Sequence, residues 1–448
     1  MDAADAESSL RIRWSVPALI QWLTHSPPYT KAVVEEMYDL TYVAMDRLRD
    51  IVNKYGIDCD WVESGALEGS IHPMEEKEEE EEEEEDDGCE MLTCAQVNEI
   101  MGRPNSSSSN DSNQNLYKWG EYDPSCAGVN PLALTSGLAD AVEQWGVKVF
   151  EHTKVAKLEK CTSSHKRKEQ QPTLGKYTIV TDQGHTLHCD HIVLCTGAES
   201  LSNSVSQRLS SSFVPVYTWM AATEPLHEKC PLKNGVAENI MSGESTMKQE
   251  QHPAPMCGDD HISLNYWRND NNKDEGRLLF GSLADTFAFP KWMISWRLRN
   301  ALAEIYPQLH NVRFDHVWGG KLAFALNAMP LIGRDMDYDD SNDDDINADD
   351  NDKNNNKSVI TDGGVWYATG FAGHGIVPTA LAGSLLANAI LGIQNQQQWQ
   401  LFQTYFPPSS WNGYPCSRMG AGMVLLVYDS WDWLYKKGVP VPPLPKLW

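Results

Sequence analysis

The sequence predicts an α/β protein into which a second, β-rich (α+β) domain is inserted. Helix-type and strand-type apolar periods alternate along the chain, as they do in α/β folds. An apolar strand, HIVLCTG at 191–197, runs into a glycine turn, and a later apolar run at 365–368 enters another. Between them, residues 213–330 alternate strand-type segments around one helix, which indicates a β-rich insertion. A chain of 448 residues is long enough for two cores.

The individual elements follow from the same periodicity. Residues 31–55 carry apolar side chains at three- to four-residue spacing and end at Gly56, which predicts an amphipathic helix with a glycine stop. Residues 60–70 predict a strand with a turn. The other predicted elements are helices at Leu132–Trp145 and Lys291–Tyr306, and strands at Val147–Phe150, Tyr177–Val180, Thr186–His188, Val214–Ala222, His261–Trp267, Leu278–Gly281 and 313–326.

Most of the negative charge lies in two short runs. Glu75–Asp87 carries a charge of −11 and Asp335–Lys357 carries −8, out of a net −27 for the chain. Such runs repel themselves and bury nothing, so we expect disordered insertions at 74–88 and 337–357. The polar stretch SSSSNDSNQN at 106–115 is expected to behave in the same way.

Composition excludes several classes of protein. No basic patch indicates nucleic acid, and the acidic balance argues against an anionic membrane surface. The ten cysteines form no C-x-x-C pair, which is typical of reduced thiols in an intracellular protein. No apolar run reaches the length of a membrane span, and MDAADAESS does not resemble a signal peptide. We therefore expect a cytoplasmic protein.

The stretch GVWYATGFAGHGIVPTALAG at 364–383 combines a strand, a glycine turn and a helix. Pro378 has no N–H and fits only the first helical turn, so the helix is expected to begin between Gly375 and Val377. His374 then lies at the positive end of the helix dipole, beside free backbone N–H groups. Such a site suits a phosphate, a carboxylate or an aromatic ring that gains negative charge. The alternative is a tight turn with a surface histidine.

Two further stretches fit this interpretation but are ambiguous alone. HIVLCTGAES ends in small residues, which let a cofactor lie against the backbone at the carboxyl edge of a sheet. An ordinary strand followed by a turn explains that stretch equally well. GVKVFEHTKVAKLE reads as a strand, a turn and a strand, and places Val155 where it can flank a planar ring.

Taken together and in this order, these segments resemble the FAD-dependent amine and amino-acid oxidoreductases of the D-amino-acid-oxidase-like family. The resemblance covers residues 8–60 and 116–435. Its ATEPL and YWR…RLLFGS segments are most similar to the branch of gamma-glutamylputrescine oxidoreductase, with D-amino-acid dehydrogenase and glycine oxidase as further members. The segments that carry it are LRIRWSVPALIQWL, GVKVFEHTKVAKLE, HIVLCTGA, PVYTWMAATEPL, NYWR…RLLFGS, WGGKLAFALNAMPLIGR and YATGFAGHGIVPTALAGSLLANAI.

The resemblance implies a Rossmann-like FAD-binding domain and a β-rich substrate domain. In this family the final helix directs its N-terminus at the flavin pyrimidine ring, where negative charge gathers on reduction. The resemblance therefore puts Val155 by the adenine, Thr196 and Gly197 near the dinucleotide, and Gly333 beside the flavin. The residues that it puts along the isoalloxazine are Gly370, Phe371, Gly373, His374, Gly375 and Ile376.

One part of the family pattern is absent from this sequence: the opening strand, G-x-G-x-x-G and helix that hold the pyrophosphate. The later G-x-G at 420–422 lies in an apolar helical segment and is interpreted as packing. We therefore expect an FAD-binding domain that is truncated at its N-terminus. Its expected segments are 1–58, 128–204 and 327–448, the last with a C-terminal helical tail, and those of the substrate domain are 59–73, 89–127 and 205–326.

Candidate residues for the reaction lie on strands of the second domain. Tyr266 and Arg268 in NYWR alternate with a tryptophan, so they share one strand face, where they can hold a carboxylate or an amine. Lys321 in WGGKLAF is a candidate to reach the flavin, and His374 completes the candidate catalytic set. A packed strand and a surface lysine are the alternatives. The histidines of HTLHCDH do not converge on a strand, so we expect no metal.

The sequence therefore predicts an FAD-dependent oxidoreductase that acts on a small-molecule amine or amino acid. Oxidation of the C–N bond would form an imine that water hydrolyses, and oxygen or another acceptor would reoxidise the flavin. Two alternatives stay open: a catalytically inactive, flavin-free relative that serves as a binding protein, and a flavoenzyme that oxidises 2-hydroxy acids. The sequence does not determine the substrate, the electron acceptor or the oligomeric state.

Overall fold

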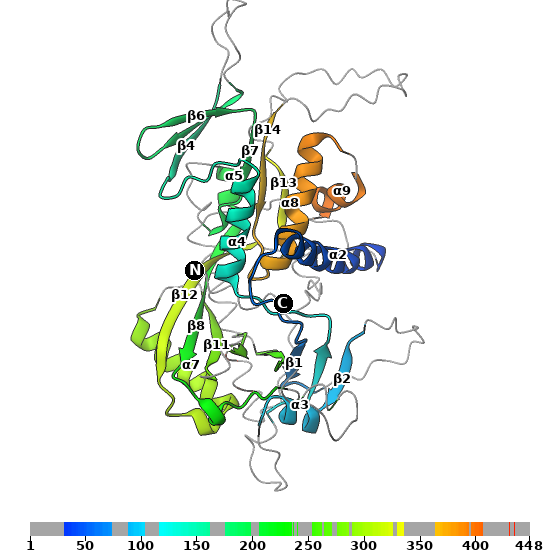
Figure 1. Cartoon of the computed structure of the whole chain (residues 1–448), viewed down its shortest axis with the longest axis vertical. Helices are drawn as coiled ribbons and strands as arrows, with labels where there is room; N and C mark the ends of the chain where they lie inside the picture. Colours follow the sequence, from blue (N-terminus) through cyan, green and yellow to red (C-terminus); the bar gives the residue numbers. More distant parts are fainter. Residues whose placement is uncertain are drawn as a thin grey trace, which may run out of the picture.

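The computed structural model describes most of the chain between residues 31 and 405 (Figure 1). The acidic runs, the polar stretch at 106–115 and nearly all of the C-terminal tail lie outside the described residues. The described residues are 31–73, 88–103, 116–161, 175–198, 206–234, 236, 240, 253–261, 264–270, 276–285, 289–325, 329–335, 363–393, 396–405, 430 and 434.

An eight-stranded sheet forms the lower part of the molecule in Figure 1, in the order β12-β8-β11-β10-β9-β1-β3-β2. Neighbouring strands are antiparallel except β9 and β1, which run parallel where two distant parts of the chain meet. The strands are β1 (Ala66–Ser70), β2 (Glu90–Thr93), β3 (Trp119–Asp123), β8 (Phe213–Thr223), β9 (Met256–Asp259), β10 (Tyr266–Asn269), β11 (Leu278–Asp285) and β12 (Phe314–Ala325). All of them fall in the segments expected to form the substrate domain, whose boundaries stay a prediction.

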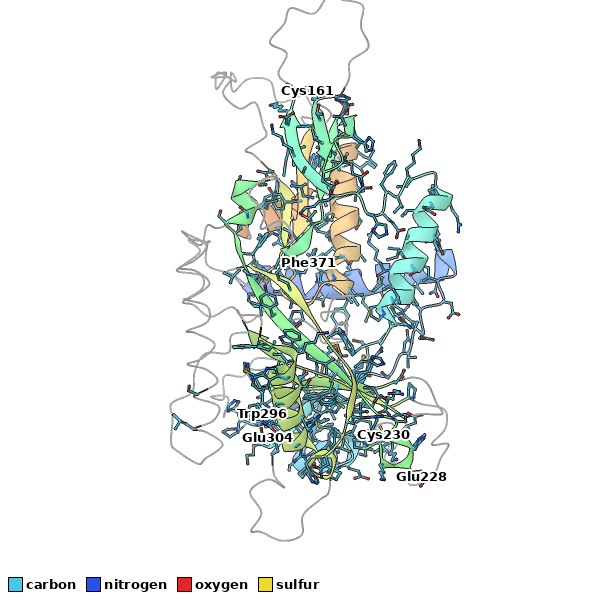
Figure 2. The ribbon with its side chains drawn as sticks, turned by 90° about the vertical axis from the view of Figure 1, so that its left-hand side faces the viewer. Cys161, Glu228, Cys230, Trp296, Glu304 and Phe371 are labelled. Atoms are coloured by element: carbon cyan, nitrogen blue, oxygen red, sulfur yellow. The ribbon has the colours of Figure 1, made fainter. Side chains whose placement is uncertain are left out.

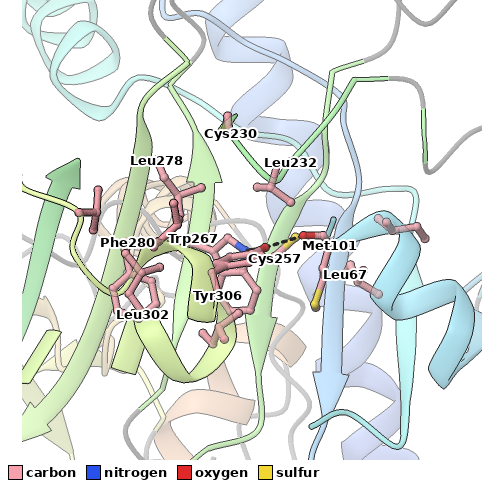
Figure 3. Close-up of a cluster of buried hydrophobic side chains, with 14 of the residues drawn as sticks. Leu67, Met101, Cys230, Leu232, Cys257, Trp267, Leu278, Phe280, Leu302 and Tyr306 are labelled. Atoms are coloured by element: carbon pink, nitrogen blue, oxygen red, sulfur yellow. Dashed lines mark hydrogen bonds between the residues drawn. The ribbon is translucent and has the colours of Figure 1, made fainter. Parts of the chain in front are cut away.

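One face of this sheet is buried against α7 (Lys291–Ile305) and α3 (Cys94–Ile100) (Figure 3). Trp267 lies at its centre and donates a hydrogen bond from Nε1 to the Tyr306 hydroxyl at 3.0 Å. That hydroxyl in turn donates to the Met101 carbonyl at 2.7 Å, so these buried polar groups are satisfied. The apolar side chains packed around them include Leu67, Val97, Cys257, Phe280, Ile294, Leu298 and Leu302.

Two three-stranded sheets form the upper part of the molecule. In the first, β14 (Gly364–Thr369) lies between antiparallel β13 (Leu331–Arg334) and parallel β7 (His191–Leu194). The second is an antiparallel meander of β4 (Val155–Lys160), β5 (Tyr177–Thr181) and β6 (Thr186–Cys189). The remaining helices are α2 (Lys31–Tyr55), α4 (Pro131–Gln144), α5 (Gln207–Ser210), η3 (His227–Lys229), η4 (Pro307–Leu309), α8 (Ile376–Leu391) and α9 (Gln396–Tyr405).

The long helices agree closely with the sequence prediction. Helix α2 ends at Tyr55, and Gly56 follows with φ +60°, a conformation that glycine adopts without a steric penalty. Its buried face, which includes Met37 and Leu40, packs against the buried face of α8. Helices α4 and α7 lie within one residue of their predicted limits. The predicted α/β class, with several sheets, is confirmed.

The predicted strand at Val147–Phe150 is wrong. This segment is irregular, and Val147 and Phe150 are 53% and 62% exposed. A strand needs a neighbouring strand to pair with, and among the described residues no strand pairs with this segment; the Val147 N–H donates instead to the Val142 carbonyl of the preceding helix. β-prone side chains alone were not sufficient to form a strand here.

Two other strand predictions need correction. The segment His261–Trp267 is not one strand, because the chain reverses direction between β9 and β10. Leu264 adopts φ +49° in that reversal. The strand predicted at 191–197 ends at Leu194, so Cys195 is exposed beyond its end instead of buried within it.

Candidate functional site

The junction between β14 and α8 is the centre of the candidate site, and it is built as the sequence predicts. Every residue of β14 is buried, and α8 begins at Ile376 with Gly375 as its N-cap. Between them the backbone turns through positive φ at Gly370 (+72°), Ala372 (+51°) and Gly373 (+96°). Only glycine adopts such angles freely, which explains the glycines of this stretch and leaves Ala372 strained.

No side chain caps the N-terminus of α8. The N-cap is a glycine, which has no side-chain acceptor for the first backbone N–H groups of the helix. Gly375 itself has helical angles, with φ −77° and ψ −38°, and a Cβ added there would lie 3.8 Å from the Phe371 Cβ. This end of the helix therefore offers N–H groups and the positive end of a dipole to an anionic or electron-rich group.

The end of β7 lies beside this turn. Because β7 and β14 run parallel, their carboxyl ends reach the same edge of the sheet, and the Thr369 hydroxyl lies 3.5 Å from the Gly197 carbonyl. Thr196 is exposed there, and Gly197 has φ +50° with no atom near the position of a Cβ. The structure thus brings Thr196 and Gly197 together with Gly370 and the turn that follows it.

His374 is half-buried at the first turn of α8. Burial lowers its pKa, against a smaller raising effect of the hydrogen bond with the Ala372 backbone. The imidazole is therefore neutral near pH 7, and the positive potential at this point comes from the helix and its N–H groups.

The turn is also tied to the large sheet. Phe371 forms an antiparallel bridge with Phe324 of β12, and the Ala372 N–H donates to the Ala323 carbonyl at 3.3 Å. Figure 2 shows Phe371 near the middle of the molecule, between the upper sheets and the large sheet. The turn therefore lies where the two parts of the protein meet.

A second connection leads from α8 to Arg268. Val129 is buried in a cluster that includes Ile376 and Val377 of the first turn of α8. Its neighbour Gly128 lies against β10, since a Cβ added to Gly128 would lie 3.2 Å from the Arg268 Nη1. The helix N-terminus and the face of β10 that carries Arg268 thus border the same region.

Tyr266 and Arg268 share one face of the sheet, as the sequence predicts. Trp267 between them is packed into the α7 core on the opposite face. Tyr266 packs with Met220, Leu279 and Trp318, and its ring covers Gly281 of the neighbouring strand. Arg268 pairs with Leu279 in the register, which puts the guanidinium on the Tyr266 face. We call this face, away from α7, the substrate wall.

Three other predicted residues lie elsewhere, and their roles stay predictions. Trp318 pairs with Met220 of the substrate wall, so Lys321, three residues further along β12, takes the opposite face. Gly333 has a packing role, because a Cβ there would lie 2.4 Å from both the Tyr367 hydroxyl and Gln403 Nε2. Val155 is half-exposed at the start of β4 in the small meander.

Sequence reasoning missed Gly128 and Ala372. Gly128 stands in the unremarkable stretch CAGVN, and only the approach of Arg268 from a strand 140 residues later makes its missing side chain important. The positive φ of Ala372 could have been suspected from the sequence, because Ala372 lies between Gly370 and Gly373, which both adopt positive φ. Its own positive φ still depends on the bond from its N–H to β12.

Comparison with known proteins assigns the class. The model of the FAD dependent oxidoreductase family, DAO, matches residues 14–389, and the chain belongs to this family. The resemblance predicted from the sequence is therefore confirmed, and the protein is an oxidoreductase of an FAD-dependent family. No helix of the described residues is both long and apolar enough to cross a bilayer.

Individual relatives agree with this assignment. The Haemophilus influenzae protein named "Probable oxidoreductase OrdL" is 24% identical, over 86% of this chain and 74% of its own length. Gamma-glutamylputrescine oxidoreductase of Escherichia coli is 24% identical over 77% of this chain, which spans 65% of that relative. Among solved structures, glycine oxidase from Bacillus cereus is similar in fold, with a TM-score of 0.54, 14% identity and 89% of each chain covered.

Proposed function

We propose that this chain binds FAD with the flavin ring against the N-terminus of α8 and oxidises the C–N bond of an amine or amino acid. The observation that carries the proposal is the uncapped helix N-terminus at Gly375, beside the end of β7 and next to the substrate wall. Membership of an FAD-dependent family supports the cofactor. The names of two relatives, gamma-glutamylputrescine oxidoreductase and glycine oxidase, support an amine or amino-acid substrate.

The residues of the junction fit the ring of such a cofactor. Gly375 carries no side chain, and the one atom within 4 Å of a Cβ built there is the Phe371 Cβ at 3.8 Å, so no described side chain covers the helix end at this residue. Thr196 and Gly197 would flank the dinucleotide at the end of β7. When bound, FAD supplies the hydride acceptor, and the helix dipole favours the negative charge that this chemistry brings to the ring.

The substrate wall would bind and orient the substrate. Tyr266 and Arg268 would hold and orient the substrate, and the apolar side chains of Met220 and Met256 would exclude water from it. Neutral His374 would contribute a hydrogen bond without a fixed charge. Lys321, on the opposite face, is a weaker candidate for contact with the flavin.

Gly375→Ala tests the position of the flavin. Alanine fits the helical angles of this residue, and its nearest neighbour would be 3.8 Å away, so the variant should fold as the wild type does. The added methyl group would obstruct the helix end, and we expect FAD affinity to fall roughly tenfold or more. The measurement is titration of the apoprotein with FAD, followed by flavin fluorescence.

Gly383→Ala is the matched control. It adds the same methyl group in the interior of the same helix, where no other atom lies within 4 Å of it. This variant should keep wild-type affinity for FAD. Equal affinities of both variants and the wild type would refute the placement of the ring at α8.

The two alternatives predict different spectra. A flavin-free binding protein would stay colourless after incubation with FAD, which would refute the proposal. A 2-hydroxy-acid oxidase would bind FAD, but lactate would bleach the flavin and alanine, its amino analogue, would not. Bleaching by amines or amino acids is the result that we expect.

A further inference from the structure

Thr218 on β8 carries a buried hydroxyl without a hydrogen-bond partner. The residue is 5% exposed, and within the described residues its Oγ1 neither donates nor accepts a hydrogen bond. By contrast, Thr223 on the same strand is fully buried, and its Oγ1 accepts the Leu278 N–H at 3.0 Å. A buried hydroxyl without a partner opposes folding, because it has lost its bonds to water and gained none in return. Groups that break this rule are concentrated at functional sites.

The side chain of Thr218 belongs to the substrate wall. Side chains alternate along β8, so Thr218 shares its face with Met220, which packs with Tyr266 and Trp318. Trp219 Nε1 also lacks a partner among the described residues, but Trp219 lies on the opposite face, against the α7 core. Of these two side chains, only that of Thr218 faces the proposed site.

The strands on both sides of Thr218 are interrupted at its level. Its partner in the register on β12 is Gly320, which adds no side chain to this face. On the other side, β11 shifts its register between Ser282 and Asp285, so no residue of β11 stands in register with Thr218. Glycines within strands often mark places where a ligand approaches the backbone, and β-bulges are frequent next to active sites.

This row of the sheet is near the proposed position of the flavin ring. Gly320 precedes Ala323 by three residues, and the Ala323 carbonyl accepts the Ala372 N–H of the turn before α8. Because a strand rises by about 3.3 Å per residue, Thr218 lies roughly 10 Å from that turn along the strands. Figure 1 shows β8 and β12 running from the large sheet toward the upper part of the molecule. A substrate that reaches the ring at α8 can therefore extend over Thr218.

The surroundings of Thr218 favour an uncharged polar group over a charged one. The side chains next to it on this face are apolar, namely Val216, Met220, Trp318 and Leu322. A charged group buried against them would lose its hydration and gain no counter-charge from these side chains, whereas a hydroxyl or an amide loses much less. A threonine hydroxyl can both donate to such a group and accept from it.

We infer that the Thr218 hydroxyl forms a hydrogen bond with an uncharged polar group of the substrate, a hydroxyl or an amide, and so selects substrates that carry such a group in addition to the amine that is oxidised. The inference rests on the proposed function, because it uses the position of the substrate wall beside α8. It adds a specificity-determining residue on β8 to the proposed site.

The test compares the purified protein, incubated with FAD, with Thr218→Val and Thr218→Ser. One set of probes is linear amino alcohols of two to six carbons, each against the alkylamine in which a methyl group replaces the hydroxyl. The other is asparagine against leucine, which exchanges the amide for an apolar group of the same shape. Binding is measured by calorimetric titration, and oxidation by bleaching of the flavin.

We expect at least one polar probe to bind roughly 5- to 100-fold more tightly than its apolar counterpart, because the counterpart leaves the buried hydroxyl without a partner. Thr218→Val should abolish that ratio, since valine keeps the shape without the hydroxyl. Thr218→Ser should retain it, since serine keeps the hydroxyl.

Thermal unfolding separates substrate binding from a structural role. Thr218→Val should melt at or above the wild-type temperature, because it removes a buried hydroxyl without a partner. Thr223→Val is the matched control on the same strand: it should melt lower, since it leaves the Leu278 N–H without its acceptor, and keep the preference for the polar probe. A lower melting temperature for Thr218→Val with an unchanged preference would overturn the inference. Weaker FAD binding by Thr218→Val with an unchanged preference would assign the hydroxyl to the cofactor and overturn it as well.

The outcomes also separate this inference from the proposed function. A preference for a polar probe that depends on Thr218, without bleaching of the flavin by any probe, would support the inference and refute the proposed oxidation. Bleaching that is equal for polar and apolar probes would support the oxidation and overturn the inference. Failure of every probe to bind would also overturn it.

Discussion

Asp259 on β9 gives the sharpest prediction for stability. Its carboxylate is fully buried and accepts hydrogen bonds from the Tyr117 hydroxyl at 2.9 Å and Asn265 Nδ2 at 3.1 Å. His261 Nδ1 lies 2.9 Å from the same carboxylate. These groups come from both chain segments that meet at the parallel pair β9 and β1, so the carboxylate joins the two halves of the large sheet.

Asp259→Asn should lower the free energy of unfolding by about 3 kcal/mol, the lower end of the cost of breaking a buried ion pair, because the amide keeps one acceptor for Tyr117. The assay is urea denaturation followed by tryptophan fluorescence, with His261→Gln and the double variant completing a cycle. We expect the double variant to lose less free energy of unfolding than the two single variants lose together, because it leaves neither Asp259 nor His261 buried without the other. Single losses that add to within about 0.5 kcal/mol would refute the coupling.

The same pair determines a dependence on pH. Burial alone would raise the pKa of Asp259, but His261 and the hydrogen bonds from His261, Asn265 and Tyr117 lower it overall. A carboxyl with a lowered folded-state pKa stabilises the fold above its unfolded pKa of about 3.9, and that stability is lost as the pH falls through the folded value. Wild-type stability should therefore fall more steeply than that of Asp259→Asn below about pH 4. Parallel curves would contradict this reasoning.

Two substitutions test the glycine-rich part of the molecule. Ala372→Gly should raise the free energy of unfolding by roughly 0.5–1 kcal/mol. Glycine removes the strain that alanine bears at a φ of +51°, and this gain exceeds the entropy that glycine adds to the unfolded chain. A lower melting temperature of the variant would show that the alanine methyl group is needed for packing. Gly333→Ala should lower the free energy of unfolding by about 1–3 kcal/mol, because its Cβ would lie 2.4 Å from both Tyr367 and Gln403. An unchanged melting temperature would show that these two side chains move aside freely.

Local sequence predicted elements that depend only on near neighbours. The apolar period of 31–55 together with Gly56 predicted α2 and its end, and Pro378 placed the start of α8 within a residue or two. Both succeed because helix hydrogen bonds join residues four apart, so the information lies within the segment. The glycine turn before α8 was predictable for the same reason.

Strands depended on partners that the local sequence does not specify. Val147–Phe150 has strong strand propensity, but no strand pairs with it among the described residues. His261–Trp267 is not one strand, because the chain turns back there so that β10 can pair with antiparallel β9. Strand pairing joins residues far apart in the chain, so periodicity alone could not decide it.

By itself, the sequence determined the class of protein and the candidate site at the start of α8, because a proline, three glycines and a buried strand encode that junction within twenty residues. Only the tertiary structure decided which side chains face it. Arg268 was a predicted candidate, and only the structure shows that its buried Nε has no acceptor among the described residues and that Gly128 leaves space beside its guanidinium. The surroundings of a buried charge are made by segments far apart in the chain, so the local sequence could not specify them.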